Sequence, residues 1–314
     1  MSTLFSRPRD ASSRAAALLV HETSVPYVRS VVEFVRHQLA LHLGRDPFYS
    51  ECADVATAGV PAGSLVFLVG AGFPRYPRQP GCRYVFLNFS LVRKLRWWMP
   101  ISLAAARWMR AQRLALLAKQ DLYDMVLDFH PHQTRLLRKE LARAGVPVQT
   151  FMAGVPSDAR PHTATPLTSR RWDVCFTGTD SPRRTRIRAL LETRGITVSP
   201  GTAPGLATVI GDCRLVANVH FADCDTLEAP RIVHAFTAGI CLVTEPCYGL
   251  TDLAPPSCYV SVPYRRIPDA ISDLLRNPAR IEAISRCAAE HLHAHYAVRA
   301  TESWRAIAQH ALAL

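Results

Sequence analysis

Residues 172–199, WDVCFTGTDSPRRTRIRALLETRGITVS, hold the pattern that decides the fold. The apolar run at 172–177 predicts a buried strand, and a second strand is expected at 196–199. Between them, Ser181 is typical of a helix N-cap, and Gly195 is typical of the residue that follows a helix. Strand, helix and strand in this order predict two parallel strands joined by a crossover helix.

The same alternation of strands and helices continues in both directions from this unit. We expect further strands at 15–20, 64–69, 84–87, 125–129, 147–151, 215–219, 240–244 and 259–262. Helices are expected at 227–238, 268–276, 278–295 and 299–312, and also after the first strand and within 91–119. This order is the signature of parallel sheets with helices on both faces.

The length of 314 residues suits two α/β domains of about 150 residues each. The proline-rich segment 154–171, GVPSDARPHTATPLTSRR, has little apolar content and is the best candidate for a linker. We therefore predict two Rossmann-like domains with a cleft between them, comprising residues 1–155 and 156–314. The final helix either stays with the second domain or packs back on the first.

Composition narrows the class of protein without choosing a function. The net charge of +12 favours anionic partners, such as nucleotide diphosphates, an acidic acceptor, a membrane surface or nucleic acid. No stretch of 18 uncharged apolar residues occurs, so a transmembrane helix is not expected. The apolar run at 15–20 is too short for a signal-peptide core. Nine cysteines without a CxxC pair indicate reduced thiols, and we expect a cytoplasmic location.

Polar residues follow three of the strands expected in the second half of the chain. They are Gly178 with Thr179, the pair Asn218 and His220, and Glu245. In open α/β sheets, ligands bind beyond the carboxyl ends of the strands. These residues are therefore expected to converge on one ligand.

The first of these groups has the features of an anion site. Gly178 lets a ligand approach the backbone, and the helix that begins at Pro182 offers unpaired N–H groups and a positive dipole end. Arg183 and Arg184, in the first turn of this helix, can form bidentate hydrogen bonds with a diphosphate. The alternative is a capped helix whose arginines are solvated.

A second polar group lies on the helix expected at 227–238. Glu228 and Arg231 are three residues apart and therefore share a face of that helix. A glutamate at the start of a helix that meets a nucleotide could accept both hydroxyls of a ribose. The alternative interpretation is an ordinary internal ion pair.

Three segments carry a family resemblance: WDVCFTGTDSPRRTRIRALLETRGI at 172–196, LVANVHFADCDTLEAPRIVHAFTAGICLVTE at 215–245 and IPDAISDLLRNPARIEAISRCAAEHLHAHY at 267–296. The middle segment is the most specific, with Asn-x-His, a variable loop, Leu-Glu-x-x-Arg-Ile, a glycine turn and Val-x-Glu in that order. Together the segments resemble the C-terminal half of GT-B glycosyltransferases, especially the spore-maturation-protein-like group. RYVFLNFSLV at 83–92 and DLYDMVLDFHPHQTRLLRK at 121–139 resemble the N-terminal half more loosely.

The resemblance implies a nucleotide-sugar donor held by the second domain, with no further cofactor. Gly178 and Arg183 would meet the diphosphate. Glu228 would face the ribose, and Arg231 would orient the ribose or the diphosphate. His234 stands where many GT-B enzymes have a glutamate, so either Glu228 takes the ribose role, which we favour, or His234 contacts the donor. The predicted donor site comprises Gly178, Thr179, Arg183, Arg184, Asn218, His220, Glu228, Arg231, His234 and Glu245.

The first domain is expected to hold the acceptor and, in an inverting enzyme, a general base near the acceptor hydroxyl. Two strand ends supply candidates for that base, His21 with Glu22 and Asp128 with His130; Asp128 either orients His130 or acts alone. A retaining enzyme needs no such base, and the stereochemistry stays open. No Asp-x-Asp motif lies at a strand end, so no metal is expected. The predicted acceptor side comprises Asn88, Trp97, Trp98 and His130.

Other classes of protein have less support in the sequence. A dehydrogenase would need GxGxxG after its first strand, which GAGFPR at 70–75 does not match, and a P-loop is absent. Arginines interleaved with tryptophans over 93–113 keep open a nucleic-acid-binding or membrane-surface module. A third alternative is an inactive GT-B domain that only binds. We predict a metal-independent glycosyltransferase; an anionic or sugar-bearing acceptor and a peripheral membrane contact would both suit this basic segment.

Overall fold

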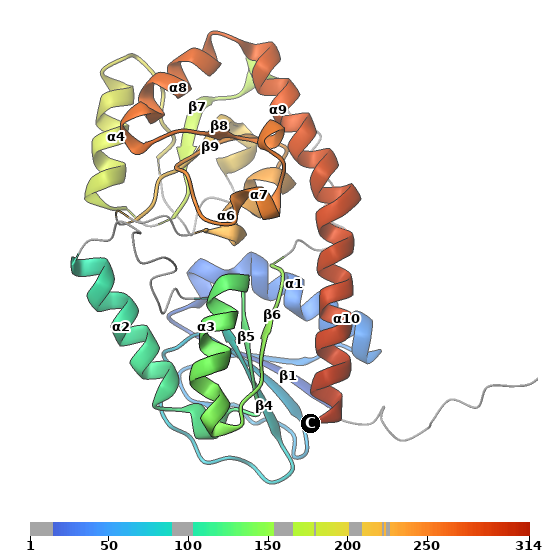
Figure 1. Cartoon of the computed structure of the whole chain (residues 1–314). Helices are drawn as coiled ribbons and strands as arrows, with labels where there is room; N and C mark the ends of the chain where they lie inside the picture. The colour runs from blue at the N-terminus through green and yellow to red at the C-terminus, as the bar shows by residue number, and fades with distance from the viewer. Residues whose placement is uncertain are drawn as a thin grey trace, which may run out of the picture.

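The computed structural model describes residues 15–89, 103–153, 166–178, 180–200, 209–221, 223 and 227–314. These residues form two β-sheets, one of six strands and one of four, and every strand pair in both sheets is parallel. Figure 1 shows the two sheets in separate halves of the molecule, each with its own helices. The predicted α/β architecture of two Rossmann-like domains is therefore confirmed.

The first sheet has the strand order β2-β1-β3-β4-β5-β6. Its strands are β1 (Ala16–His21), β2 (Phe48–Cys52), β3 (Leu65–Val69), β4 (Arg83–Asn88), β5 (Met125–Asp128) and β6 (Val148–Thr150), and its helices are α1 (Val25–Leu43), α2 (Leu103–Leu117) and α3 (Pro131–Leu141). Strands β1, β3 and β5 are buried along their whole lengths, as expected for a parallel sheet covered on both faces. The sequence did not predict β2, whose residues FYSEC lie at the sheet edge with none of them fully buried.

The second sheet has the order β10-β9-β8-β7. Its strands are β7 (Trp172–Phe176), β8 (Cys213–Asn218), β9 (Cys241–Thr244) and β10 (Val260–Ser261), and its helices are α4 (Pro182–Glu192), α6 (Ala229–Thr237), α7 (Leu250–Leu253), α8 (Ile267–Leu275) and α9 (Pro278–His291). The strand predicted at 196–199 contributes only one isolated parallel bridge, between Val174 and Val198. Beside that bridge, the Asp173 carboxylate accepts hydrogen bonds from the backbone N–H and hydroxyl of Thr197, both at 2.8 Å.

The C-terminal helix α10 (Ala297–Ala313) returns from the second domain to the first. It continues from α9 through a π-helical turn, Leu292–Tyr296, and runs alongside α1 (Figure 1, red). The ring of Trp304 is fully buried, with centroids 6.4 Å from Phe34 and 5.8 Å from Phe151. Its indole N–H donates to the carbonyl of Met152 at 3.0 Å. The final helix therefore completes the core of the first domain.

The predicted linker falls between the two sheets, after β6 and before β7. Residues 154–165 of it lie outside the described residues. Among the helices that the structure does describe, none is both long and apolar enough to cross a membrane.

Candidate functional site

The carboxyl ends of strands from the two sheets face one another. His130 follows β5 in the first domain and Tyr248 follows β9 in the second, and their rings lie 5.9 Å apart with planes inclined by 9°. His130 Nε2 is 3.4 Å from the Tyr248 carbonyl, and the Tyr248 hydroxyl is 3.3 Å from Nδ1 of His132. Ligands of parallel α/β sheets bind at such strand ends. This contact therefore locates the region in which a shared site can form.

Two arginines pack against the backbone of Gly178, the second residue after β7. The φ of Gly178 is +85°, in the left-handed region that favours glycine. A Cβ at this position would lie 2.6 Å from Cζ of Arg231 and 2.9 Å from Nη1 of Arg184. Arg184 is fully buried, and its Nε donates to the Val219 carbonyl at 2.8 Å. The chain therefore holds two guanidinium groups together at one strand end.

Carboxylates and a second arginine both act on the Arg184 guanidinium, the carboxylates being Glu228, Asp180 and Glu245. Burial, and after it the charge of Arg231, lowers the pKa of the Arg184 guanidinium to about 10. Glu228 forms an ion pair with Arg231 through Oε1. Its second oxygen, Oε2, is buried and accepts no hydrogen bond from any residue that the structure describes. Both arginines would attract an anion placed beside them.

Arg183 makes a different set of contacts from its neighbour. It forms ion pairs with Glu245 and with Asp223, the latter at 3.4 Å, and its guanidinium lies 4.1 Å from the centre of the Tyr264 ring. The other oxygen of Glu245 accepts the backbone N–H of His220 at 2.7 Å. Burial raises the pKa of the Glu245 carboxyl. Arg183 is therefore anchored to the carboxyl end of β9.

The side chain of Asn218 links neighbouring strands of the second sheet. Its side chain is fully buried, accepts the Thr177 hydroxyl at 2.8 Å and donates to the Thr244 hydroxyl at 3.2 Å. These bonds join the carboxyl ends of three adjacent strands, β7, β8 and β9. Among the other predicted donor residues, His234 is half-buried on α6, and Thr179 lies outside the described residues.

On the first domain, Asp128 sits at the end of β5 in a closed network of hydrogen bonds. Its Oδ2 accepts from Asn88 at 2.6 Å and from Gln133 at 2.7 Å, and its Oδ1 accepts the backbone N–H of His130 at 2.8 Å. The carboxyl is fully buried, and this burial raises its pKa to about 7 against the opposing effect of the three bonds. Asp128 is thus placed to hold Asn88 and His130 in position.

We expect the Asp128 carboxyl to lower the free energy of unfolding as pH rises between about 4 and about 7. Its pKa is raised on folding, so the folded state binds more protons than the unfolded state in this window, and raising the pH favours unfolding. Urea denaturation at a series of pH values would measure the effect, with Asp128→Asn as the variant that does not titrate. The stability difference between the two proteins should change across the window and level off above it. An unchanging difference would contradict the expectation.

His21 ends β1 inside a tight turn. Its Nδ1 lies 2.8 Å from the Thr23 hydroxyl, and its ring meets Phe73 edge-on at 5.1 Å. A Cβ on Gly72 would lie 2.6 Å from Cε1 of His21, so the loop after β3 leaves room for the imidazole only because residue 72 is glycine. Glu22, the next residue, is exposed.

The remaining predictions concern the acceptor side and metals. Trp97 and Trp98 lie outside the described residues. Asn88 and His130 lie together around Asp128, as given above. Across the described ranges, no group of three or more His, Cys, Asp or Glu side chains is arranged to hold a metal ion.

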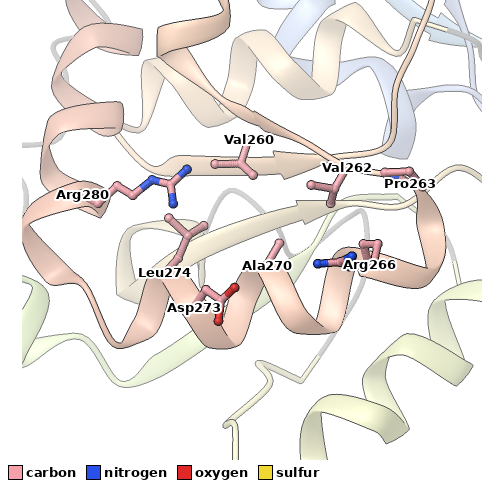
Figure 2. A pocket seen from close by; sticks show the side chains of 8 residues that line it. All are labelled: Val260, Val262, Pro263, Arg266, Ala270, Asp273, Leu274 and Arg280. Atoms are coloured by element: carbon pink, nitrogen blue, oxygen red, sulfur yellow. The ribbon is translucent and has the colours of Figure 1, made fainter.

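A separate hollow of about 400 Å³ lies between β10 and α8 (Figure 2). It is lined by Val260, Val262, Pro263, Arg266, Ala270, Asp273, Leu274 and Arg280. None of these eight residues belongs to the predicted donor or acceptor groups, and we assign no ligand to it.

Several solved structures are similar to this chain. No protein-family model and no curated protein matches it. HepE from Anabaena, crystallised with UDP and glucose, has 10% identity and a TM-score of 0.58, over 95% of this chain and 98% of HepE. Sucrose-phosphate synthase from Thermosynechococcus elongatus has 15% identity and a TM-score of 0.57, over 95% of this chain and 97% of that one.

TarM from S. aureus, crystallised with UDP, has 12% identity and a TM-score of 0.55, over 80% of this chain. The match covers 56% of TarM, so the present chain spans little more than half of that protein. At these identities the likeness shows the fold alone. The fold is that of the GT-B glycosyltransferases, with two Rossmann-like domains.

Proposed function

We propose that this chain is a glycosyltransferase that moves a sugar from a nucleotide-diphosphate sugar to an acceptor, without a metal ion and with the donor held by the second domain. HepE and TarM were crystallised with UDP, and HepE also with UDP-glucose, which supports a nucleotide-sugar ligand for this fold. The resemblance of three sequence segments to the spore-maturation-protein-like group is part of the same proposal.

The observation that carries the proposal is the pairing of Arg184 and Arg231 against Gly178. Arg184 is buried and Arg231 is half-buried, and two guanidinium groups held this close together attract an anion. A diphosphate offers oxygens that guanidinium groups bind in a bidentate manner. The same charges would stabilise the diphosphate as it leaves in the transition state.

Glu228 would complete the donor site on the ribose side. Arg231 already holds its Oε1, and this contact fixes the direction of the carboxylate. Oε2 keeps its acceptor capacity, since no described residue donates to it. A ribose hydroxyl placed there would satisfy a buried oxygen.

We expect Glu228→Ala to weaken the binding of nucleoside diphosphate by about 1–3 kcal/mol, because a ribose hydroxyl would lose its partner. Titration calorimetry on folded protein would measure the change in Kd. Arg186→Ala is the matched control, since Arg186 is an exposed residue on α4. Unchanged affinity in a folded Glu228→Ala variant would remove this residue from the site.

A panel of thermal melts tests the function itself. UDP, GDP, dTDP and their sugars should raise Tm, and the nucleotide-sugar with the largest shift should release its nucleoside diphosphate on incubation. Binding without any release, with every acceptor tried, would favour an inactive GT-B domain. A salt-sensitive shift with DNA and none with nucleotides would favour a nucleic-acid-binding module instead.

A further inference from the structure

Helix α2 presents an unusual exposed surface. Leu103, Arg107, Arg110 and Leu114 follow one another at spacings of four, three and four residues, so they form one stripe along the helix. All four are exposed, Leu103 at 80% and Leu114 at 54%. On the other side of α2, Met109 and Leu116 are buried against the first domain.

Apolar exposure is concentrated on this helix. The described residues include eight large hydrophobic side chains that are exposed, and three of them, Leu103, Trp108 and Leu114, belong to the 15 residues of α2. Trp108 is 48% exposed, on the flank of the surface away from the leucines. Single exposed apolar side chains are ordinary, but a group of them on one helix marks an interaction site.

The charge on α2 has one sign. The helix, LAAARWMRAQRLALL, contains no acidic residue. Arg113 forms an ion pair with Glu140 of α3, with 2.9 Å between Nε and Oε2, and this contact helps to hold α2 on the first domain. Within the described part of the chain, Arg107 and Arg110 have no ion-pair partner. The surface therefore offers two arginines to an anionic partner.

The combination of exposed leucine and arginine on one stripe favours one of two anionic partners, a nucleic acid or a membrane. Nucleic acid would draw its affinity from the arginines and would gain little from Leu103 or Leu114, because phosphate contacts dominate such binding. A bilayer with anionic headgroups takes up both kinds of side chain, apolar ones below the headgroups and basic ones among them. We propose that α2 docks this protein on an anionic phospholipid membrane through Leu103, Arg107, Arg110 and Leu114, with the helix lying in the membrane surface.

Vesicle sedimentation with the full chain tests this directly. The protein should bind phosphatidylcholine vesicles that contain phosphatidylglycerol, bind pure phosphatidylcholine vesicles much more weakly, and release from the former at high salt. Arg107→Glu/Arg110→Glu should lower the partition coefficient by at least about tenfold. Leu103→Ser/Leu114→Ser should also lower it, because the apolar contribution is lost.

Matched controls come from the opposite side of the molecule, where α10 and α1 lie (Figure 1). Arg299→Glu/Arg305→Glu reverses the same number of exposed charges, and Leu41→Ser/Val298→Ser removes two apolar side chains that are 56% and 51% exposed. Both controls should bind vesicles like the unaltered protein. Thermal melts establish that each variant is folded.

Three results would overturn the proposal. They are no binding to anionic vesicles, an equal loss in the control variants, and full vesicle binding in Leu103→Ser/Leu114→Ser with binding to DNA through the arginines. The outcome is independent of the proposed function. Nucleotide-dependent shifts in Tm, measured on the same variants, show separately whether the donor site is intact.

Discussion

We expect the His21→Ala variant to lose about 10²–10⁴-fold in turnover rate while its affinity for nucleoside diphosphate stays unchanged, because His21 is our candidate for the general base. The sequence offered three residues for this role in the first domain: His21, Glu22 and Asp128. We choose His21 by comparing the surroundings of the three residues. Asp128 is fully buried, with both oxygens accepting hydrogen bonds. Glu22 is exposed and is not held in one orientation by any described side chain.

The imidazole of His21, by contrast, is held in a fixed position at a strand end. Nδ1 accepts the backbone N–H of Thr23 at 3.4 Å and lies 2.8 Å from the Thr23 hydroxyl, so the neutral ring has its lone pair on Nδ1 and its proton on Nε2. The residue is 8% exposed and packs on Phe73, so it is largely shielded from water without being sealed off. As a general base, the imidazole would take the proton of an acceptor hydroxyl on Nδ1, in place of its contacts with Thr23.

Turnover is measured as release of nucleoside diphosphate from the nucleotide-sugar that raises Tm most, with water and simple sugars as acceptors. Donor affinity is measured separately by calorimetry. His310→Ala, an exposed histidine on α10, is the control and should keep its turnover. Near-normal turnover in His21→Ala would mean that the mechanism is retaining or that the acceptor lies elsewhere.

The second large effect concerns stability. We expect Trp304→Ala to lower the free energy of unfolding by about 3–5 kcal/mol. The indole is the largest fully buried side chain in the described chain, and it fills the space between Phe34 and Phe151. Its removal leaves a cavity and also leaves the Met152 carbonyl without its donor.

Denaturant titration followed by circular dichroism would measure this change. Val298→Ala is a control in the same helix, because Val298 is 51% exposed and its truncation creates no cavity. If the two variants unfold at the same denaturant concentration, α10 does not contribute to the core as described. A transition that splits in two in Trp304→Ala would indicate that the domains unfold separately.

Much of the fold could be predicted because the strands of both sheets are continuous apolar runs with glycines between them. The exceptions have physical causes. β2, with the sequence FYSEC, sits at an edge of the first sheet, where burial does not require an apolar run. Residues 196–199 resemble a strand in composition. However, the Asp173 carboxylate accepts the hydrogen bond from the backbone N–H of Thr197, and the segment forms only one isolated β-bridge.

The sequence predicted that polar residues at three strand ends of the second domain converge, and hydrogen bonds of Asn218 join those strand ends. That they bind a donor stays a prediction. The sequence interpretation put Arg183 on the diphosphate, whereas the structure places Arg184 against Gly178 and Arg183 beside Glu245. A signal for this difference was present. Arg184 precedes Ile187 by three residues and therefore shares its face of α4, and Ile187 is buried on the inner face of that helix. The helical periodicity thus predicts that Arg184 points inward.

The contact between His130 and Tyr248 could not have been predicted from the sequence. It joins residues 118 positions apart and depends on how the two domains meet. No period or motif encodes that arrangement, because each domain folds around its own sheet. The approach of the two sets of strand ends becomes visible only in three dimensions.

The return of α10 to the first domain has a consequence for how the chain matures during synthesis. β6 ends at Thr150, so the ribosome must add the whole second domain before Trp304 can reach Phe34 and Phe151. At roughly 5–20 residues per second this takes roughly 8–30 s. Throughout that interval the nascent first domain carries an uncovered aromatic surface that chaperones can bind. The domain that is synthesised first is therefore the one that is completed last.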